Sequence, residues 1–155
     1  MIRTSTFRHH HVQLRSTVDE LSAVLAWSES IDAAEQAALR VQELKGQLTI
    51  HLELEDTLLY ARLLTHPSAA VREAALGFKE EIVRFAAGFA DYCRTWQRPQ
   101  TIGGDWATFV ADTRAQLADL ARRVHREETV LFPLIDGADG APVDGSDGSP
   151  AEAAP

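Results

Sequence analysis

A histidine and a glutamate in the middle of the chain have the spacing of a paired site on one helix face. His51 and Glu55 are four residues apart, so in an α-helix their side chains lie one above the other. Both fall at the centre of a predicted buried stripe, roughly 100° wide, that is drawn by Leu44, Leu48, Leu58 and Leu59. A buried carboxylate costs several kcal/mol unless it is paired or bound to a cation. Another part of the chain must therefore supply a partner for Glu55.

The periodicity of the apolar residues predicts the elements that position this pair. Long amphipathic helices are expected at about residues 5–28, 33–64, 68–96 and 106–132. Asp32 and Asp105 are the expected N-caps of the second and fourth helices, and Pro133 marks the approximate end of the fourth. Residues 98–104 form the expected connection before the fourth helix. Four long helices with short connections favour an all-α fold, an antiparallel up-down-up-down four-helix bundle.

Composition separates a folded part from a tail and excludes several classes of function. Residues 1–135 are expected to form the bundle domain, whereas 136–155 lack apolar periodicity and are expected to be a disordered acidic tail. The net charge of −8 argues against nucleic-acid binding, and no apolar run is long enough for a signal peptide or a membrane span. The single cysteine, Cys93, excludes an intrachain disulfide framework. These features favour a cytoplasmic protein.

Every predicted helix carries a histidine or a glutamate at the depth of the central pair. Counting residues from each turn places His11 of the first helix at this level, together with Glu81 of the third. The fourth helix brings His125 and Glu127 to the same level. Imidazole and carboxylate ligands together suit first-row metals such as iron, zinc or manganese. The sequence therefore predicts a metal site in the centre of the bundle.

Three short motifs resemble the hemerythrin-like family of HHE cation-binding domains. Residues 11–15 read H-V-Q-L-R, similar to H-x-x-[IL]-R; residues 51–60 are similar to H-x-x-x-E-E-x-x-L-F; and residues 127–133 end in the family's L-F-P. The resemblance covers about residues 7–134. It implies a non-haem di-iron centre that is bridged by carboxylates and has terminal histidine ligands. The residues that match this pattern position by position are His11, His51, Glu55 and Glu127.

Two positions depart from the family pattern. The third helix of the family carries a histidine where this sequence has Glu81. The family's fourth helix carries a histidine four residues before the first glutamate of E-E-x-x-L-F-P, and here that position is Arg123. His125 is offset from that position by two residues, which rotates it by about 200° around the helix axis.

Three arrangements of the site remain open at this point. In the first, Glu81 is a ligand in place of the missing histidine, which gives a carboxylate-rich site similar to those of ferritin-like bundles. In the second, the fourth helix is locally shifted so that His125 and Glu128 both face inward. In the third, Arg123 occupies the space of one metal and pairs with Glu81 or Glu127.

The function expected from these residues is that of a metalloprotein for small ligands. The first hypothesis is a non-haem iron pair that binds, senses or handles O2, NO or peroxide. The alternative is a metal-free or single-zinc bundle with a structural or interaction role, in which Glu81 and Arg123 have disabled the site. A third class is an enzyme that consumes peroxide or NO, which only a turnover assay distinguishes. No membrane or nucleic-acid partner is expected.

Overall fold

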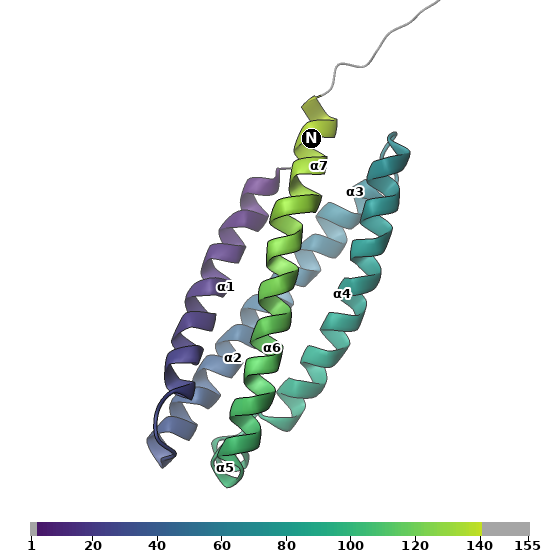
Figure 1. Ribbon diagram of the computed structural model, residues 1–155. Coiled ribbons are helices and arrows are strands. Elements are labelled where there is room, and N and C mark those ends of the chain that lie inside the picture. The colour runs from purple at the N-terminus through teal and green to yellow at the C-terminus, as the bar shows by residue number, and fades with distance from the viewer. Residues whose placement is uncertain (1–2, 141–155) are drawn as a thin grey trace, which may run out of the picture.

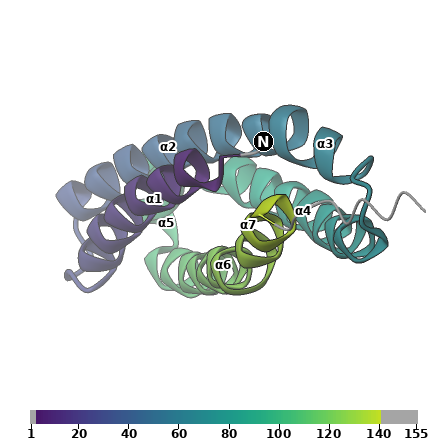
Figure 2. The same cartoon turned by 90° about the horizontal axis from the view of Figure 1, so that it is seen from above.

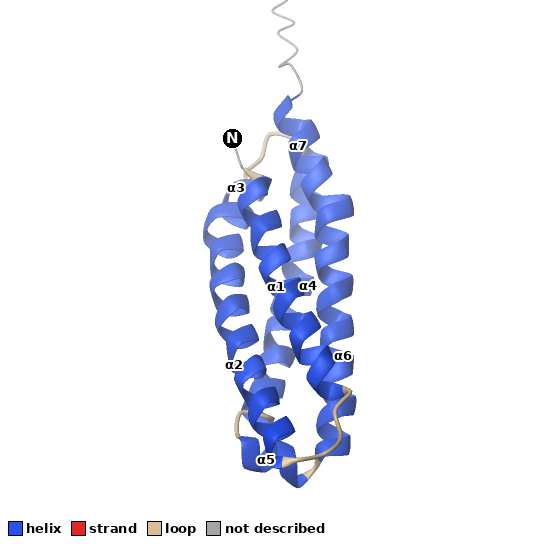
Figure 3. Cartoon of the chain, turned by 90° about the vertical axis from the view of Figure 1, so that its left-hand side faces the viewer, coloured by secondary structure: helices blue, strands red, loops and turns tan. Residues whose placement is uncertain are grey.

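The computed structural model describes residues 3–140, and nearly all of them are helical. The long helices are α1 (Thr4–Leu25), α2 (Ile31–Leu54), α4 (Ala69–Thr95) and α6 (Trp106–Arg126). They lie lengthwise beside one another, as Figures 1 and 3 show. Between residues 3 and 140 there is no β-strand, so the prediction of an all-α fold is confirmed.

Consecutive long helices run in opposite directions along the molecule. In Figure 1, α1 descends from the end at which α7 finishes, α2 returns to that end, α4 descends again and α6 climbs back. Seen from above, these helices surround a common centre (Figure 2). This arrangement allows side chains from several helices to meet in the middle. Within the described range, no helix is both long and apolar enough to cross a membrane.

Two of the long helices pass directly into a π-helical segment and continue as an α-helix beyond it. Each such continuous run of helical residues is called a rod below. The first, η1 (Glu55–Tyr60), follows α2 and leads into α3 (Ala61–Leu63). The second, η2 (Glu127–Leu131), follows α6 and leads into α7 (Phe132–Gly140). A π turn closes i to i+5 and so takes up more residues than an α turn. The extra residue changes the register of the helix faces beyond it.

Leu58 shows the effect of this change in register. A continuous α-helix would place both Leu58 and Leu59 on the buried stripe, as the sequence predicts. The structure buries Leu59 completely but leaves Leu58 51% exposed, so the prediction for Leu58 is wrong. The cause is the π geometry of η1, which rotates Leu58 away from the core.

The helix ends agree with some of the expected caps and differ from others. The Asp105 side chain accepts a hydrogen bond from the Thr108 backbone N–H at 3.2 Å, which confirms it as the cap of α6. The cap of α2 is Ser30, whose hydroxyl accepts from the Ala33 N–H at 3.0 Å, so Asp32 lies inside the helix instead. The expected connection forms a short helix, α5 (Pro99–Gly104), because proline is favoured at the first helical position.

The last helix continues beyond the predicted end. Pro133 does not stop it, because the helical backbone passes directly from η2 into α7 and continues through Pro133. The Thr4 hydroxyl donates to the Asp136 carboxylate at 3.0 Å and ties this helix to the start of α1. The structure therefore keeps residues 136–140 helical, where the sequence predicts the beginning of the tail. Residues 141–155, the rest of the predicted tail, lie outside the described residues.

The buried apolar residues form two clusters, one toward each end of the helices. The cluster toward α5 includes Leu14 of α1, Leu48 of α2 and Val124 of α6. The cluster toward α7 includes Phe7, Leu59, Leu131 and Phe132. On each of these rods, the residues between the two clusters are the polar ones that the sequence singled out. The fold thus sets the candidate site between two apolar layers.

Candidate metal centre

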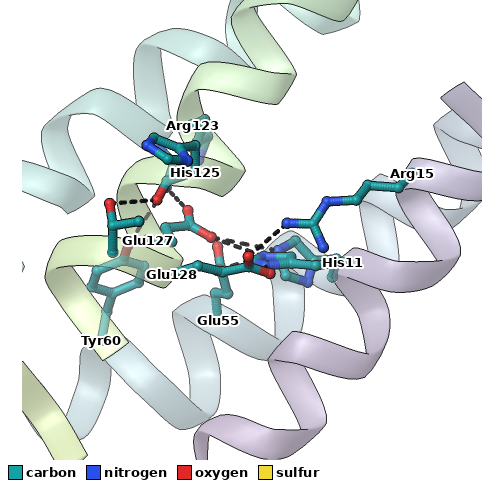
Figure 4. A network of polar contacts seen from close by, with 10 residues as sticks. His11, Arg15, Glu55, Tyr60, Arg123, His125, Glu127 and Glu128 are labelled. Carbon is teal, nitrogen blue, oxygen red and sulfur yellow. Dashed lines mark hydrogen bonds and ion pairs between the residues drawn. The ribbon is translucent and has the colours of Figure 1, made fainter. Parts of the chain in front are cut away.

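The described residues contain one buried group of side chains that can hold a metal ion. It consists of His11, His51, Glu55 and Glu127, which each offer one ligand atom within 4.8 Å of the others. None of these residues is more than 3% exposed. They come from α1, the end of α2, the first position of η1 and the first position of η2 (Figure 4). The structure therefore brings together the residues that match the family pattern position by position.

The π segments explain how each rod buries two residues beside its glutamate. Glu55, Leu59 and Tyr60 are all buried on η1. In a regular α-helix, Tyr60 would lie about 140° around the axis from Glu55. The i to i+5 bonding of a π turn brings both side chains to the same side of the rod. Glu127, Leu131 and Phe132 repeat this arrangement around η2, and π turns of this kind are frequent at functional sites.

His11 is held in place by a chain of contacts that leads to the surface. Its Nδ1 lies 2.9 Å from Oε1 of Glu128, and the other oxygen of Glu128 accepts a hydrogen bond from Arg15 at 2.6 Å. When Nδ1–H donates to Glu128, the Nε2 atom is the ring nitrogen that faces the centre, 3.0 Å from Glu127. Carboxylates that orient a histidine in this way are typical of metal sites.

The protonation of His11 depends on the same carboxylates. Burial lowers the pKa of His11, but the contacts with Glu127 and Glu128 outweigh burial, and the pKa is raised overall. The Glu127 and Glu128 carboxylates thus stabilise the charged form of the ring relative to the neutral form, and both ring nitrogens donate in the charged form. A metal ion at Nε2 would replace only the proton shared with Glu127 and would leave the bond to Glu128 intact.

His51 has the opposite electrostatic character. Burial lowers its pKa to about 4, although the nearby Glu127 carboxylate opposes this shift. The ring is thus neutral at pH 7, which is the form that binds metals. Its Nε2 lies 3.2 Å from Oε1 of Glu55 and 4.0 Å from Oε2 of Glu127. The ring of His10 packs against it edge-on, with centroids 5.7 Å apart.

The two carboxylates of the centre are buried to a similar degree but are not equally paired. Burial raises the pKa of Glu55, and none of the four carboxylate oxygens of Glu55 and Glu127 accepts a well-formed hydrogen bond from any described residue. Burial and the proximity of Glu55 also raise the pKa of Glu127. Glu127, however, has the Arg123 guanidinium 2.6 Å from its Oε1. Glu55 is therefore the carboxylate that most needs a cation.

Arg123 is part of the centre, in the way that one of the three open arrangements expects. It is 8% exposed and pairs with Glu127, one turn further along the rod. Its guanidinium also lies 3.5 Å from the Tyr60 hydroxyl. It does not pair with Glu81, which instead forms a surface ion pair with the Arg126 guanidinium.

The remaining candidate residues of the sequence lie away from the buried group. The Glu81 side chain is 36% exposed, and its contact with Arg126 lowers the pKa of its carboxyl. His125 is exposed and lines a surface groove between α1 and α6, beside Arg15. Glu128 supports His11 and does not join the buried group. Neither Glu81 nor His125 belongs to the group of ligand atoms that lie within 4.8 Å of one another.

Sequence reasoning missed two features of this centre. One is the support of His11 by Arg15 and Glu128, whose signal in the sequence was the spacing of one helical turn between His11 and Arg15. The other is the pair of π segments. Their signal was a repeated pattern, a glutamate and an acidic residue followed by x-x-Leu and an aromatic residue, at residues 55–60 and 127–132.

The donor set fits one first-row metal ion. Histidine nitrogens and carboxylate oxygens bind such ions at about 2.0 to 2.2 Å, so donors on opposite sides of an ion are about 4.2 Å apart. The ligand atoms of the four residues, which lie within 4.8 Å of one another, reach this separation through small side-chain rotations. Two neutral imidazoles and two carboxylates would offset the charge of a divalent cation, to which Arg123 adds one positive charge beside Glu127.

Comparison with known proteins gives a match at the level of a family. The model of the hemerythrin HHE cation binding domain matches residues 3–135, which is most of the chain. No curated protein and no solved structure matches the chain significantly.

Proposed function

The chain belongs to the hemerythrin HHE cation-binding domain family, and from this premise we propose that its buried centre binds a first-row transition metal, with iron as the favoured ion. The ligands in this proposal are His11, His51, Glu55 and Glu127. Mixed imidazole and carboxylate ligands suit iron, and they also accept zinc or manganese. The antiparallel four-helix bundle acts as the scaffold that holds these ligands in a dry interior.

The observation that carries the proposal is the state of Glu55. Glu55 is 0% exposed, and neither of its carboxylate oxygens accepts a well-formed hydrogen bond from a described residue. The oxygens of Glu127 also lack such a bond, but Glu127 has the Arg123 guanidinium at 2.6 Å. An ionised carboxylate in such a place is strongly unfavourable without a cation. A metal ion beside His51 would supply the missing partner.

We further propose that the bound metal serves a small ligand such as O2, NO or peroxide. Four protein ligands leave open positions on an iron ion, and iron with open positions binds or activates ligands of this size. The chain itself orients His11 through Glu128 and encloses the centre between two apolar clusters. This enclosure limits the access of water and favours small, weakly polar ligands.

A second candidate function is supported by the ion pairs around Glu127. Arg123 and His11 approach Glu127 at 2.6 and 3.0 Å, so this carboxylate has partners at ion-pair distance without a metal. A metal-free or single-zinc bundle with a structural role is therefore the competing candidate. It leaves Glu55 without a cation, and for that reason the metal-binding function is the better supported.

Metal analysis of anaerobically purified protein tests the proposal. We expect bound iron, or uptake of ferrous iron by the chelator-treated protein, with an increase in the melting temperature. His51→Ala should lower the affinity by at least about 100-fold, because it removes a ligand and not only a supporting contact. His9→Ala is the matched control, since His9 is exposed on α1 and should leave the affinity unchanged.

Two results would contradict the metal-binding function. One is a protein that is purified without metal and takes up neither ferrous iron, zinc nor manganese under anaerobic conditions. The other is a melting temperature that changes neither with chelator nor with His51→Ala. Both results together would favour the structural bundle. If the protein does bind iron, turnover of peroxide or NO by the iron-loaded form would show whether the centre is that of an enzyme.

A further inference from the structure

We infer that the centre takes one metal ion and that the Arg123 guanidinium stands in the place of a second cation. This inference rests on the proposed metal binding and specifies it further. The family pattern implies two metal ions, so the inference is a disagreement between this chain and the arrangement expected from its relatives. It is carried by the contacts of Glu127, the supply of ligands and the charge of the centre.

The oxygen that a second ion would need is already occupied. A carboxylate that bridges two ions uses one oxygen for each of them. Oε2 of Glu127 faces His11 at 3.0 Å and His51 at 4.0 Å, which is the side of the proposed ion. Oε1 of Glu127 is held by Arg123 at 2.6 Å. The guanidinium therefore binds the Glu127 oxygen, Oε1, that would have to coordinate the second ion.

The described residues also lack ligands for a second ion. The buried group contains two histidines and two glutamates, and no other histidine, cysteine or acidic residue of the described range joins it. Glu81 and His125 are the nearest alternatives in the sequence, but Glu81 pairs with Arg126 and His125 is exposed. Arg123 cannot replace them, because a guanidinium has no lone pair to offer and stays protonated.

The position of Arg123 supports its assignment as a substitute cation. It precedes Glu127 by four residues on its rod, just as His51 precedes Glu55 on the other. His51 reaches Oε1 of its own glutamate at 3.2 Å, and Arg123 reaches Oε1 of its glutamate at 2.6 Å. The two side chains thus occupy equivalent places, and one of them carries a permanent charge where the other carries a ligand atom.

The charge of the centre agrees with a single ion. One divalent ion together with Arg123 exceeds the charge of Glu55 and Glu127 by one, and the nearby Glu128 is already neutralised by Arg15 at 2.6 Å. A second divalent ion would add two further positive charges to a site in which Arg123 is only 8% exposed. Such an excess of like charge in a buried place is strongly unfavourable.

The stoichiometry of metal binding in wild type and Arg123→His tests this inference. We expect anaerobic ferrous-iron titration of the chelator-treated wild type, followed by metal analysis, to end at one equivalent. Arg123→His frees Oε1 of Glu127 and adds an imidazole, so it should take up a second equivalent. Cobalt(II) gives an independent readout, because electron paramagnetic resonance distinguishes an isolated ion from a coupled pair. Arg122→His is the matched control on α6, because the Arg122 side chain is 70% exposed and pairs with Asp119 of the same helix, and this variant should remain at one equivalent.

The possible failures are distinguishable. A wild type that binds two equivalents overturns the inference but leaves the proposed metal binding intact, as does an Arg123→His variant that stays at one. A wild type that binds no iron, cobalt, zinc or manganese overturns the proposed function itself. If Arg123→His does not fold, Arg123→Lys provides the decision. It keeps the charge and should bind one equivalent, and an uptake of two by this variant would overturn the inference.

Discussion

The two halves of the metal centre share a local pattern and differ at its first position. One half reads H-x-x-x-E-D-x-x-L-Y over residues 51–60, and the other reads R-x-x-x-E-E-x-x-L-F over residues 123–132. In both halves the first glutamate opens a π-helical segment, and the leucine and the aromatic residue are buried beside it. The π-helical backbone is therefore the same in both halves. The residue that contacts the carboxylate is a histidine in the first half and an arginine in the second.

This difference shows which parts of the pattern build the fold and which decide the chemistry. The glutamate, leucine and aromatic positions face the interior because the π turn brings residues i, i+4 and i+5 to one side. The first position determines what the carboxylate meets. His51 is a neutral imidazole that supplies no charge to Glu55, whereas Arg123 is a cation beside Glu127. In the proposed function, the first half therefore needs a metal ion for its carboxylate, whereas the second half already has a cation.

The sharpest way to break this comparison is to neutralise each carboxylate in turn. In the metal-free protein, Glu127→Gln should lower the free energy of unfolding by about 3 to 5 kcal/mol, because it leaves buried Arg123 without its partner. Glu55→Gln should instead raise it by about 1 to 2 kcal/mol, because it removes an unpaired buried carboxylate. Urea unfolding in the presence of chelator measures both. Changes of the same sign would show that the halves are not different in this respect.

The pH dependence of the free energy of unfolding gives a second test of the Glu55→Gln variant. Burial raises the pKa of Glu55 above its ordinary value of 4.5, so the folded protein binds this proton more tightly than the unfolded chain. The contribution of Glu55 to stability is thus fully present below pH 4.5 and is lost as the pH rises through the folded-state pKa. Glu55→Gln should remove this loss. A stability difference between wild type and Glu55→Gln that stays constant from pH 4.5 to 8 would contradict the assigned burial effect.

The second acidic residue of each pattern allows a test of intermediate size. Glu128 orients His11 at 2.9 Å, and Glu128→Gln should weaken metal binding by about 10- to 100-fold because the imidazole loses its charged acceptor. Asp56, its counterpart, is 61% exposed and pairs with Lys79 at 3.1 Å. Asp56→Asn should therefore leave the metal affinity unchanged. Isothermal titration with ferrous iron or zinc measures both variants, and equal losses would show that Glu128 has no special role.

Much of the fold and part of the centre follow from sequence periodicity. The 3.6-residue period located the long helices, and counting residues from each turn placed His11, His51, Glu55 and Glu127 at one depth. Predicting that these four residues lie at the same depth requires only the geometry of a regular helix. The placement of Glu81 and His125 needed more, since both lie at the same depth but on other faces. For Glu81, the deciding factor was Arg126 of the neighbouring rod, and no pattern within one helix reveals such a pair.

The features that could not be predicted depend on departures from regular α geometry. An α-helical count through residues 55–60 places Leu58 inside and Tyr60 outside, which is the reverse of what η1 produces. The continuation of the last helix beyond Pro133 has the same origin, because η2 ends just before it and a new α-helix begins there. Within the π turns, the 3.6-residue period on which the sequence prediction relies does not apply.

The last position of each pattern offers the smallest test of the comparison. The Tyr60 hydroxyl lies 3.5 Å from the Arg123 guanidinium, at the long limit of a hydrogen bond, whereas Phe132 has no such group and stacks on His11 with ring centroids 5.5 Å apart. Tyr60→Phe should therefore lower the free energy of unfolding by at most about 1 kcal/mol and leave the metal stoichiometry at one. A loss of several kcal/mol, or a second equivalent of metal, would mean that Tyr60 and not Glu127 fixes Arg123. The centre would then depend on both patterns equally, and the arginine half would no longer be self-contained.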